Sequence, residues 1–174
     1  KMLILVGGIH ATIVPEDLAL KGVIDLVIRG EGGTAMQALV PRLEAGQELP
    51  EGNGFLPVAS PRFHELAAES PPMIPEFNRV PPPRRDLVQG SRYFCIWSGE
   101  RRSRLPTLFP ETGTLRTSVG CPHRCSFCVV HHLAHGHYLE REPEDVVEEI
   151  AGLPQEHVYF LDDEMFINRK RKEA

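Results

Sequence analysis

Short apolar runs alternate with polar turns and amphipathic stretches through the first quarter of the chain. The runs MLILV and VIDLVI each end in a glycine-rich turn, GGIHAT and RGEGG respectively. Each turn is followed by apolar residues at helical spacing, first in PEDLAL and then in AMQALVPRLEAG. Two successive strand–turn–helix units predict an open parallel α/β sheet. Pro41 lies inside the second helix and is expected to bend or shorten it, because proline removes an internal hydrogen bond.

The last third of the chain also alternates between strand and helix patterns. LRTSV, residues 115–119, is a β-prone run that stops at Gly120. An amphipathic helix is predicted over 142–153, followed by an apolar strand over 157–161. Together they form a βαβ unit, with the loop after Gly120 at the carboxyl end of its first strand, where parallel α/β folds place their sites. The apolar stripe of the helix consists of Val146, Val147, Ile150 and Leu153.

The segment between these two patterns is rich in proline. Nine of the sixteen prolines lie between residues 50 and 83, which is typical of an extended connector with polyproline character. The sequence therefore predicts three parts: residues 1–45, a Pro-rich linker over 46–113, and residues 114–174. Within the linker, the stretches RYFCIWSG and RLPTLFP are apolar enough to pack as short strands or hairpin arms.

Composition excludes several classes of protein. The chain is 41% hydrophobic and 25% charged, with a formal net charge of −5, which is typical of a folded globular protein. Mild acidity disfavours nonspecific nucleic-acid binding. No apolar run is long enough to span a membrane. We therefore expect a cytoplasmic protein with no nucleic-acid or membrane partner.

The cysteines carry the strongest chemical signal. Cys121, Cys125 and Cys128 form a Cys-x3-Cys-x2-Cys pattern in the string GCPHRCSFC. Three thiolates in a short loop suit a four-iron, four-sulfur cluster in which one iron has no protein ligand and stays open to a substrate. Cys95, the fourth cysteine, is expected to be a small apolar residue in a strand rather than a further ligand.

A zinc site is the alternative for the same region. Mixed Cys/His tetrahedra are common, but the usual zinc ribbon pairs two Cys-x2-Cys knuckles, and only Cys125 and Cys128 form such a pair here. Disulfides are disfavoured, because the sequence shows no signal peptide and a reducing compartment is expected. The histidines that crowd the loop are His123, His131, His132, His135 and His137.

The cysteine loop resembles that of the radical S-adenosylmethionine enzymes, which have this spacing and an aromatic residue just before the last cysteine, here Phe127. The resemblance implies that Cys121, Cys125 and Cys128 hold a 4Fe-4S cluster. It also implies that the amino and carboxylate groups of S-adenosylmethionine chelate the open iron, and that reduction cleaves the sulfonium to a 5'-deoxyadenosyl radical. An electron donor of the flavodoxin or ferredoxin type would supply the electron.

Three acids follow the predicted strand over 157–161. In this family, residues at that strand end help to hold the amino group of S-adenosylmethionine, and the motif FLDDEMFIN looks like the form common in the cobalamin-dependent branch. Solvated turn residues are the alternative, because acids at strand ends are ordinary. The residues concerned are Asp162, Asp163 and Glu164.

The first two turns carry a second resemblance. GGIHAT followed by RGEGG is similar to the final part of the cobalamin-binding domain that precedes many radical S-adenosylmethionine barrels. One departure is Gly33, where the family has a second acid. His10 is expected to line the site rather than to ligate cobalt, and a generic doubly wound α/β fragment is the alternative for the whole segment. The resemblance implies that the corrinoid is lined by Gly7, Gly8, His10, Thr12, Gly30, Glu31 and Gly32.

These resemblances imply an α/β architecture in three parts. Residues 1–45 would be the last part of a Rossmann-like cobalamin-binding sheet, followed by the Pro-rich linker. Residues 114–174 would be the first βα units of a partial TIM-type radical S-adenosylmethionine barrel. A cobalamin-type sheet has about five parallel strands, of which two are visible, so the sequence predicts a piece of a longer protein, truncated at both ends.

The expected function is that of a cobalamin-dependent methyltransferase acting on an unactivated carbon or phosphorus. The small-molecule substrate and the catalytic residues are not specified by the sequence. Oxidative cyclisation or rearrangement is the alternative within the family. A noncatalytic remnant or a zinc-binding module is the alternative outside it.

Overall fold

The structure is a computed structural model of the 174-residue chain, and it describes residues 2–72, 81–88, 111–165 and 167. They divide into two compact units. The first unit comprises Lys1–Glu76 and Pro122–His137, and the second comprises Phe77–Cys121 and Tyr138–Ala174. Cys95 and the strands or arms predicted around it lie outside the described residues.

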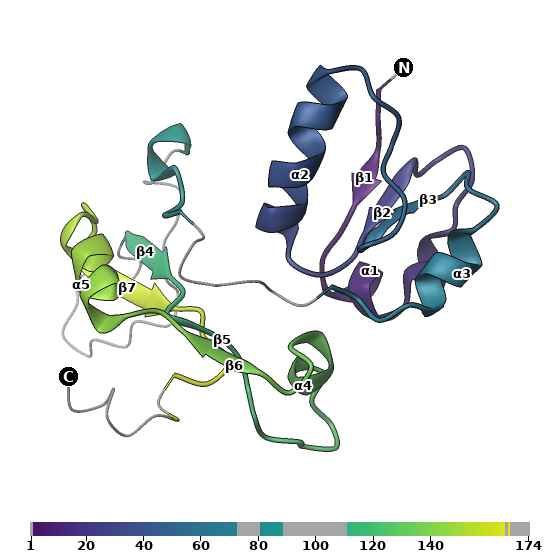
Figure 1. Ribbon diagram of the computed structural model, residues 1–174. Helices are drawn as coiled ribbons and strands as arrows, with labels where there is room; N and C mark the ends of the chain where they lie inside the picture. The colour runs from purple at the N-terminus through teal and green to yellow at the C-terminus, as the bar shows by residue number, and fades with distance from the viewer. Residues whose placement is uncertain (1, 73–80, 89–110, 166, 168–174) are drawn as a thin grey trace. The chain divides into compact units, whose positions relative to one another are not determined.

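A three-stranded sheet with the order β1-β2-β3 forms the centre of the first unit (Figure 1). β1 (Leu5–Val6) pairs parallel with β2 (Leu26–Ile28), which confirms the parallel pair predicted from the two apolar runs. β3 (Phe55–Pro57) pairs antiparallel with the other edge of β2. The sheet is therefore mixed, and both glycine-rich turns follow the carboxyl ends of its parallel strands.

The side chains of β2 alternate between two hydrophobic clusters. Leu26 and Ile28 pack with Leu39 of α2 (Gly32–Glu44), whereas Val27 packs with residues of α1 (Ile9–Ile13) and α3 (Phe63–Ala68). Figure 1 shows α2 on one face of the sheet and α1 and α3 on the other. Burial on both faces is what a continuous apolar run such as VIDLVI favours.

The helices after the two turns differ from the pattern predicted for them. PEDLAL forms only a 3-10 turn, η1 (Pro15–Leu18), after the short α1. α2 continues through Pro41 to Glu44, so the expected shortening is wrong. Pro41 lies in the last turn of α2, where its missing N–H costs one hydrogen bond and its own carbonyl still accepts from the amide of Ala45 at 3.0 Å.

The linker predicted over 46–113 begins too early. Within residues 46–72 the chain contributes β3 and α3 to the first unit, and Leu56 and Phe63 are buried in its core. The prolines there do not prevent strand pairing, because Pro57 lies on β3, an edge strand. Residues 46–72 therefore belong to the first unit.

A buried arginine joins three segments of the first unit. Arg29 follows β2 and is 6% exposed. Its guanidinium donates to the carbonyls of Thr12, Ala67 and Glu69 at 3.1, 3.0 and 2.7 Å. Two of these carbonyls lie at the C-terminal end of α3, where the helix dipole favours a cation. Burial lowers the pKa of the Arg29 guanidinium from its ordinary value, and Glu16 and Glu69 oppose that shift.

The second unit contains a βαβ arrangement, as predicted, but its first strand lies at residues 112–115 rather than 115–119. β4 (Thr112–Leu115) pairs parallel with β7 (His157–Phe160), and α5 (Pro143–Ala151) lies between them in the chain. Pro143 occupies the first turn of α5 and Gly152 follows its last residue, positions that favour these two residue types. On α5 Val146 is buried, but Val147 is 64% exposed, which corrects the predicted stripe.

The run LRTSV is not one strand, as predicted, but spans a break between two. β4 ends at Leu115, and β5 (Ser118–Gly120) pairs antiparallel with β6 (Tyr138–Glu140). The two residues between β4 and β5 let the chain leave its partner β7 and turn toward β6. The cysteine loop therefore follows β5. In the part of the chain that the structure describes, no helix has the length and apolar character needed to cross a membrane.

Replacing Arg29 with methionine is expected to destabilise the first unit by about 2 to 4 kcal/mol, because several buried carbonyls lose their donor at once. Chemical denaturation monitored by circular dichroism measures this change. Arg62→Met is the matched control, since Arg62 pairs with Glu65 at the surface, where solvent screens the pair and its loss should change the free energy of unfolding little. Equal effects of the two substitutions would contradict the role assigned to Arg29.

Candidate functional site

The cysteine loop begins directly after β5. Gly120, the last residue of β5, has φ +86°, a conformation that favours glycine and turns the chain into the loop. Cys121 and Cys128 are half-buried and Cys125 is exposed, and all three are free thiols. The amide of Cys128 donates to the carbonyl of Cys125 at 3.0 Å, and α4 (Val130–Leu133) starts shortly afterwards.

This donor set has the chemistry that an iron–sulfur cluster requires. Three free thiols lie within eight residues of one loop, and thiolates are the usual ligands of such clusters. Phe127, next to the last cysteine, is 90% exposed. Within the described residues no group of three His, Cys, Asp or Glu side chains lies in a metal-binding arrangement, so the joint role of the three cysteines remains a prediction.

The histidines after the loop make contacts of their own. The rings of His131 and His132 lie 3.8 Å apart, and Nε2 of His135 lies 3.1 Å from the carbonyl oxygen of Pro71. Nδ1 of His131 is buried and has no hydrogen-bond partner among the described residues. These contacts do not gather histidines around the cysteines, and the zinc alternative gains no support from them.

The three acids predicted to bind S-adenosylmethionine follow β7 and lie against β5. Oδ1 of Asp162 accepts from the amide and hydroxyl of Thr117 at 2.9 Å each, and from the amide and hydroxyl of Ser118. Asp163 accepts from the amide of Gly120 at 3.4 Å, and the backbone carbonyl of Glu164 accepts from the Ser118 hydroxyl at 3.0 Å. Asp162 and Asp163 thus lie beside the strand that leads into the cysteine loop, and the role of the three acids toward S-adenosylmethionine stays a prediction.

The two oxygens of the Asp162 carboxylate differ in their hydrogen bonding, and Oδ2 is the exceptional one. It is buried and has no hydrogen-bond partner among the described residues. A buried carboxylate oxygen without a partner is costly, and such an atom in a native structure needs an explanation. One explanation is a cationic group of a ligand, which would match the negative charge of the Asp162 carboxylate.

In the first unit, Thr12 joins the two glycine-rich turns. Its hydroxyl donates to the carbonyl of Gly8 at 2.8 Å and accepts from the amide of Gly30 at 3.0 Å. Gly8 and Gly30 have φ +97° and +85°, so a side chain at either would strain the backbone. One hydroxyl therefore fixes both turns at the same edge of the sheet.

The other residues predicted to line a corrinoid have mixed roles. Glu31 caps α2, because its carboxylate accepts from the amides of Gly33 and Thr34 at 2.9 and 2.6 Å. A side chain at Gly33 would crowd that carboxylate, since its Cβ would lie 3.2 Å from both oxygens, which accounts for glycine at this position. His10 is exposed, with Nε2 3.1 Å from Asp17. A Cβ on Gly32 would meet no atom within 4 Å.

Gly7 is packed differently from Gly8 and Gly32. A Cβ on Gly7 would lie 3.5 Å from the carbonyl oxygen of Ile28, in ordinary contact with β2, whereas one on Gly8 would meet no atom of the described residues within 4 Å. The backbone at Gly8 and Gly32 is therefore open to a ligand, which fits the close approach that a large planar cofactor would need. The corrinoid role of all seven residues remains a prediction.

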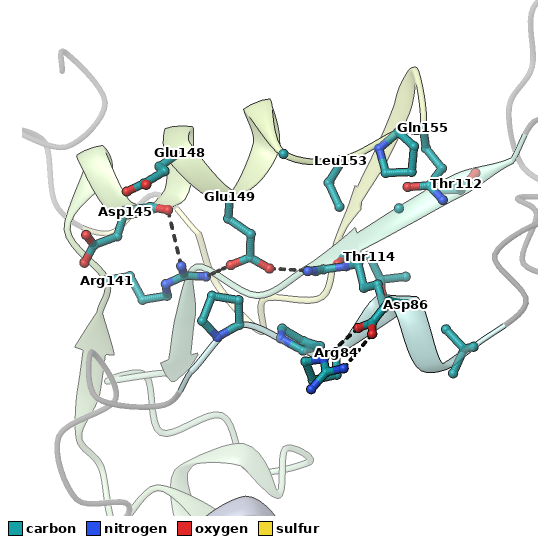
Figure 2. Close-up of a pocket in the computed structure, with 17 residues that line it drawn as sticks. Arg84, Asp86, Thr112, Thr114, Arg141, Asp145, Glu148, Glu149, Leu153 and Gln155 are labelled. Atoms are coloured by element: carbon teal, nitrogen blue, oxygen red, sulfur yellow. Dashed lines mark hydrogen bonds and ion pairs between the residues drawn. The ribbon is translucent and has the colours of Figure 1, made fainter.

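A separate pocket of about 1100 Å³ lies at the amino end of β4. Its wall includes η3 (Arg85–Leu87), β4 and the C-terminal end of α5. Glu149 lies between two arginines: Arg85 is 2.6 Å from one carboxylate oxygen, and Arg141, labelled with Glu149 in Figure 2, is 2.5 Å from the other. The side chain of Glu149 is 5% exposed, so the three charges form a largely buried network that attaches the segment 81–88 to α5.

Sequence reasoning missed Arg29 and the Glu149 network. An arginine at the end of a fully apolar strand, as in DLVIRGEGG, is a signal that could have identified Arg29, because a charge in such a position needs buried acceptors. Nothing local marks Glu149, whose partner Arg85 lies 64 residues away in the sequence.

No family model matches the chain, but several curated proteins do. It is 32% identical to the uncharacterised methyltransferase PH0819 of Pyrococcus horikoshii, over 97% of this chain and 35% of that protein. It is 30% identical to the anaerobic magnesium-protoporphyrin IX monomethyl ester cyclase of Rubrivivax gelatinosus, over 95% of this chain and 29% of that protein. It is also 30% identical to the hopanoid C-3 methylase of Methylococcus capsulatus, over 93% of this chain and 28% of that protein.

A solved structure has a similar fold. It is the radical S-adenosylmethionine methyltransferase TsrM from Kitasatospora setae, with cobalamin and a [4Fe-4S] cluster bound. The TM-score is 0.61 at 22% identity, over 97% of this chain and 32% of that one. The chain thus spans about a third of the length of the proteins it matches.

Proposed function

We propose that this chain, which belongs to the family of cobalamin-dependent radical S-adenosylmethionine enzymes, carries cofactor-binding residues of a methyltransferase. The observation that carries the proposal is the pairing of two features of β5: three free thiols lie in the loop that follows it, and Asp162, whose Oδ2 has no hydrogen-bond partner among the described residues, contacts its first residue. Thiolates are the usual ligands of iron–sulfur clusters, and a carboxylate oxygen accepts from the N–H groups of an amine. S-adenosylmethionine bound to a cluster through its amino group would use both.

In this proposal Cys121, Cys125 and Cys128 hold a 4Fe-4S cluster. When bound, the cluster supplies the electron that cleaves S-adenosylmethionine. The protein's own contribution is to present three thiolates from one loop and leave a fourth iron position without a protein ligand. Oδ2 of Asp162 accepts from an N–H of the iron-bound amino group of S-adenosylmethionine, and Asp163 and Glu164 add negative charge nearby. An electron donor of the flavodoxin or ferredoxin type completes the system.

The first unit supplies part of a cobalamin site in the same proposal. The turns at Gly8 and Gly30–Gly32 follow the carboxyl ends of β1 and β2, where parallel α/β sheets bind ligands. Thr12 fixes the two turns to each other, and the backbone at Gly8 is open. The residues that would line the corrinoid are Gly7, Gly8, His10, Thr12, Gly30, Glu31 and Gly32.

The reaction we propose is methyl transfer to an unactivated carbon or phosphorus of a small molecule. The methyltransferases among the relatives support it. Oxidative cyclisation is the second candidate, because two relatives are cyclases of a magnesium-protoporphyrin ester. Transfer of an isotope-labelled methyl group from S-adenosylmethionine to product separates the two reactions.

Anaerobic reconstitution with iron and sulfide is expected to give a brown protein with about four irons per chain. Replacing Cys121, Cys125 or Cys128 with alanine should abolish the absorption near 400 nm, because each cysteine supplies one of three ligands. Iron and sulfide analysis together with the visible spectrum measure the outcome.

Cys95→Ala is the matched control and should take up as much iron as the wild type. Stoichiometric binding of zinc without any cluster under the same anaerobic conditions would contradict the proposal and favour the zinc alternative.

Cobalamin binding is expected to depend on the Thr12 hydroxyl. Thr12→Val removes the hydrogen bonds to Gly8 and from Gly30, so the two turns lose their common anchor, and affinity for hydroxocobalamin should fall about tenfold. Thr12→Ser keeps the hydroxyl and should bind as the wild type does. Titration followed by visible absorption gives the dissociation constants. A valine variant that binds as tightly as the serine variant would disprove the role of Thr12, and absence of binding by a protein of the relatives' full length would disprove the cobalamin assignment.

A further inference from the structure

The segment after β7 contacts β5 and its partner β6 through four consecutive residues. Asp162 accepts from Thr117 and Ser118, Asp163 from the amide of Gly120, and the Glu164 carbonyl from the Ser118 hydroxyl. The carbonyl of Met165 accepts from the hydroxyl of Tyr138, on the partner strand β6, at 3.3 Å. The strand-end acids are therefore part of the packing of β5 as well as neighbours of the cysteine loop.

Asp162 makes the densest of these contacts. A single oxygen, Oδ1, accepts from two backbone amides and two hydroxyls, all belonging to Thr117 and Ser118. Both of these residues are 0% exposed. Water therefore cannot replace the carboxylate as an acceptor, and hydrogen bonds from buried amides to a charged group are among the stronger ones in proteins.

The four donors lie at the break between β4 and β5. β4 leaves β7 after Leu115, and β5 begins at Ser118 with a different partner, β6. At such a break the backbone amides are no longer hydrogen-bonded to the first partner strand and not yet to the second. Buried amides in this position need another acceptor. Oδ1 of Asp162 is that acceptor, and it comes from the residue two positions beyond the end of β7.

The break sets where the cysteine loop starts. Cys121 is three residues beyond Ser118, and only Val119 and Gly120 lie between them. The direction of β5 therefore fixes the backbone position of Cys121, whereas Cys125 and Cys128 lie further along the loop. Any loosening of the contact between Asp162 and Ser118 would move Cys121 first.

We propose that Asp162 is a positioning residue for Cys121, in addition to any contact it makes with S-adenosylmethionine. Oδ1 holds the break that directs β5 into the cysteine loop, and Oδ2, buried and without a partner among the described residues, is left for the ligand. The consequence for the cluster rests on the proposed function. The structural consequence at Thr117 and Ser118 is independent of the proposed function.

Two substitutions of Asp162 separate the two oxygens. Asp162→Ala removes both, so the amides of Thr117 and Ser118 should exchange with solvent at least about tenfold faster than in the wild type. The reconstituted variant should also lose most of its iron. Asp162→Asn keeps one carbonyl oxygen, and the four donors orient the side chain so that this oxygen takes the position of Oδ1. Amide exchange at Thr117 and Ser118 and the iron content should therefore stay near wild type. Its affinity for S-adenosylmethionine should fall, because an amide nitrogen replaces Oδ2.

The measurements are amide-resolved hydrogen exchange on the protein before reconstitution, iron and sulfide analysis after it, and equilibrium binding of S-adenosylmethionine. Glu156→Gln is the matched control: Glu156 is an exposed acid of the same unit, and the same change from acid to amide there should leave exchange at Thr117 and Ser118 unchanged.

The outcomes distinguish the inference from the proposed function. Wild-type exchange and wild-type iron content in Asp162→Ala would overturn the inference while leaving the proposed function intact. A wild-type protein that takes up no iron would overturn the proposed function, and the exchange comparison would still test the positioning role. If Asp162→Ala does not fold, Asp162→Asn decides: protected amides support the positioning role, and unprotected amides overturn it.

Discussion

Parallel pairing of β4 with β7 is the constraint on which the second unit depends. It brings the residues that follow β7 to the point where β4 ends, although the two strands are more than forty residues apart in the chain. Asp162 can then accept from Thr117 and Ser118, and β5 leaves the sheet in a fixed direction toward β6. The start of the cysteine loop follows from that direction. A different register between β4 and β7 would separate the carboxylate from its donors.

In the first unit, buried backbone groups are also satisfied by a charged side chain, but its charge is positive. There the turns after β1 and β2 are joined by the Thr12 hydroxyl, and the buried guanidinium of Arg29 gathers carbonyls from α1 and the end of α3. In both units a polar group just beyond a parallel strand satisfies buried backbone groups of a neighbouring segment. The candidate ligand sites lie beside these polar groups, at backbone that is already ordered.

Periodic segments were predictable from the sequence, because their pattern is local. The pair β1–β2, the strand β7 and the helices α2 and α5 follow from apolar runs and helical spacing, whereas β4 lies before the run that was predicted as a strand. β3 and α3 were missed because the prolines around them outweighed a short apolar signal. The mixed character of the first sheet was missed for the same reason.

Features that depend on distant residues were not predictable. The break between β4 and β5 depends on Asp162, 44 residues beyond Ser118, and the Glu149 network joins residues 64 apart. The cysteine spacing and the strand-end acids identified the candidate site, since those signals are local. Which oxygen of Asp162 is already occupied could be known only from the structure.

The central claim is that the cysteine loop holds a cluster with one iron open to S-adenosylmethionine. Electron paramagnetic resonance of the reduced, reconstituted protein, recorded with and without S-adenosylmethionine, tests it most directly. The account predicts the signal of a reduced 4Fe-4S cluster whose g-values change when S-adenosylmethionine is added. A cluster signal that stays identical at saturating S-adenosylmethionine would contradict it.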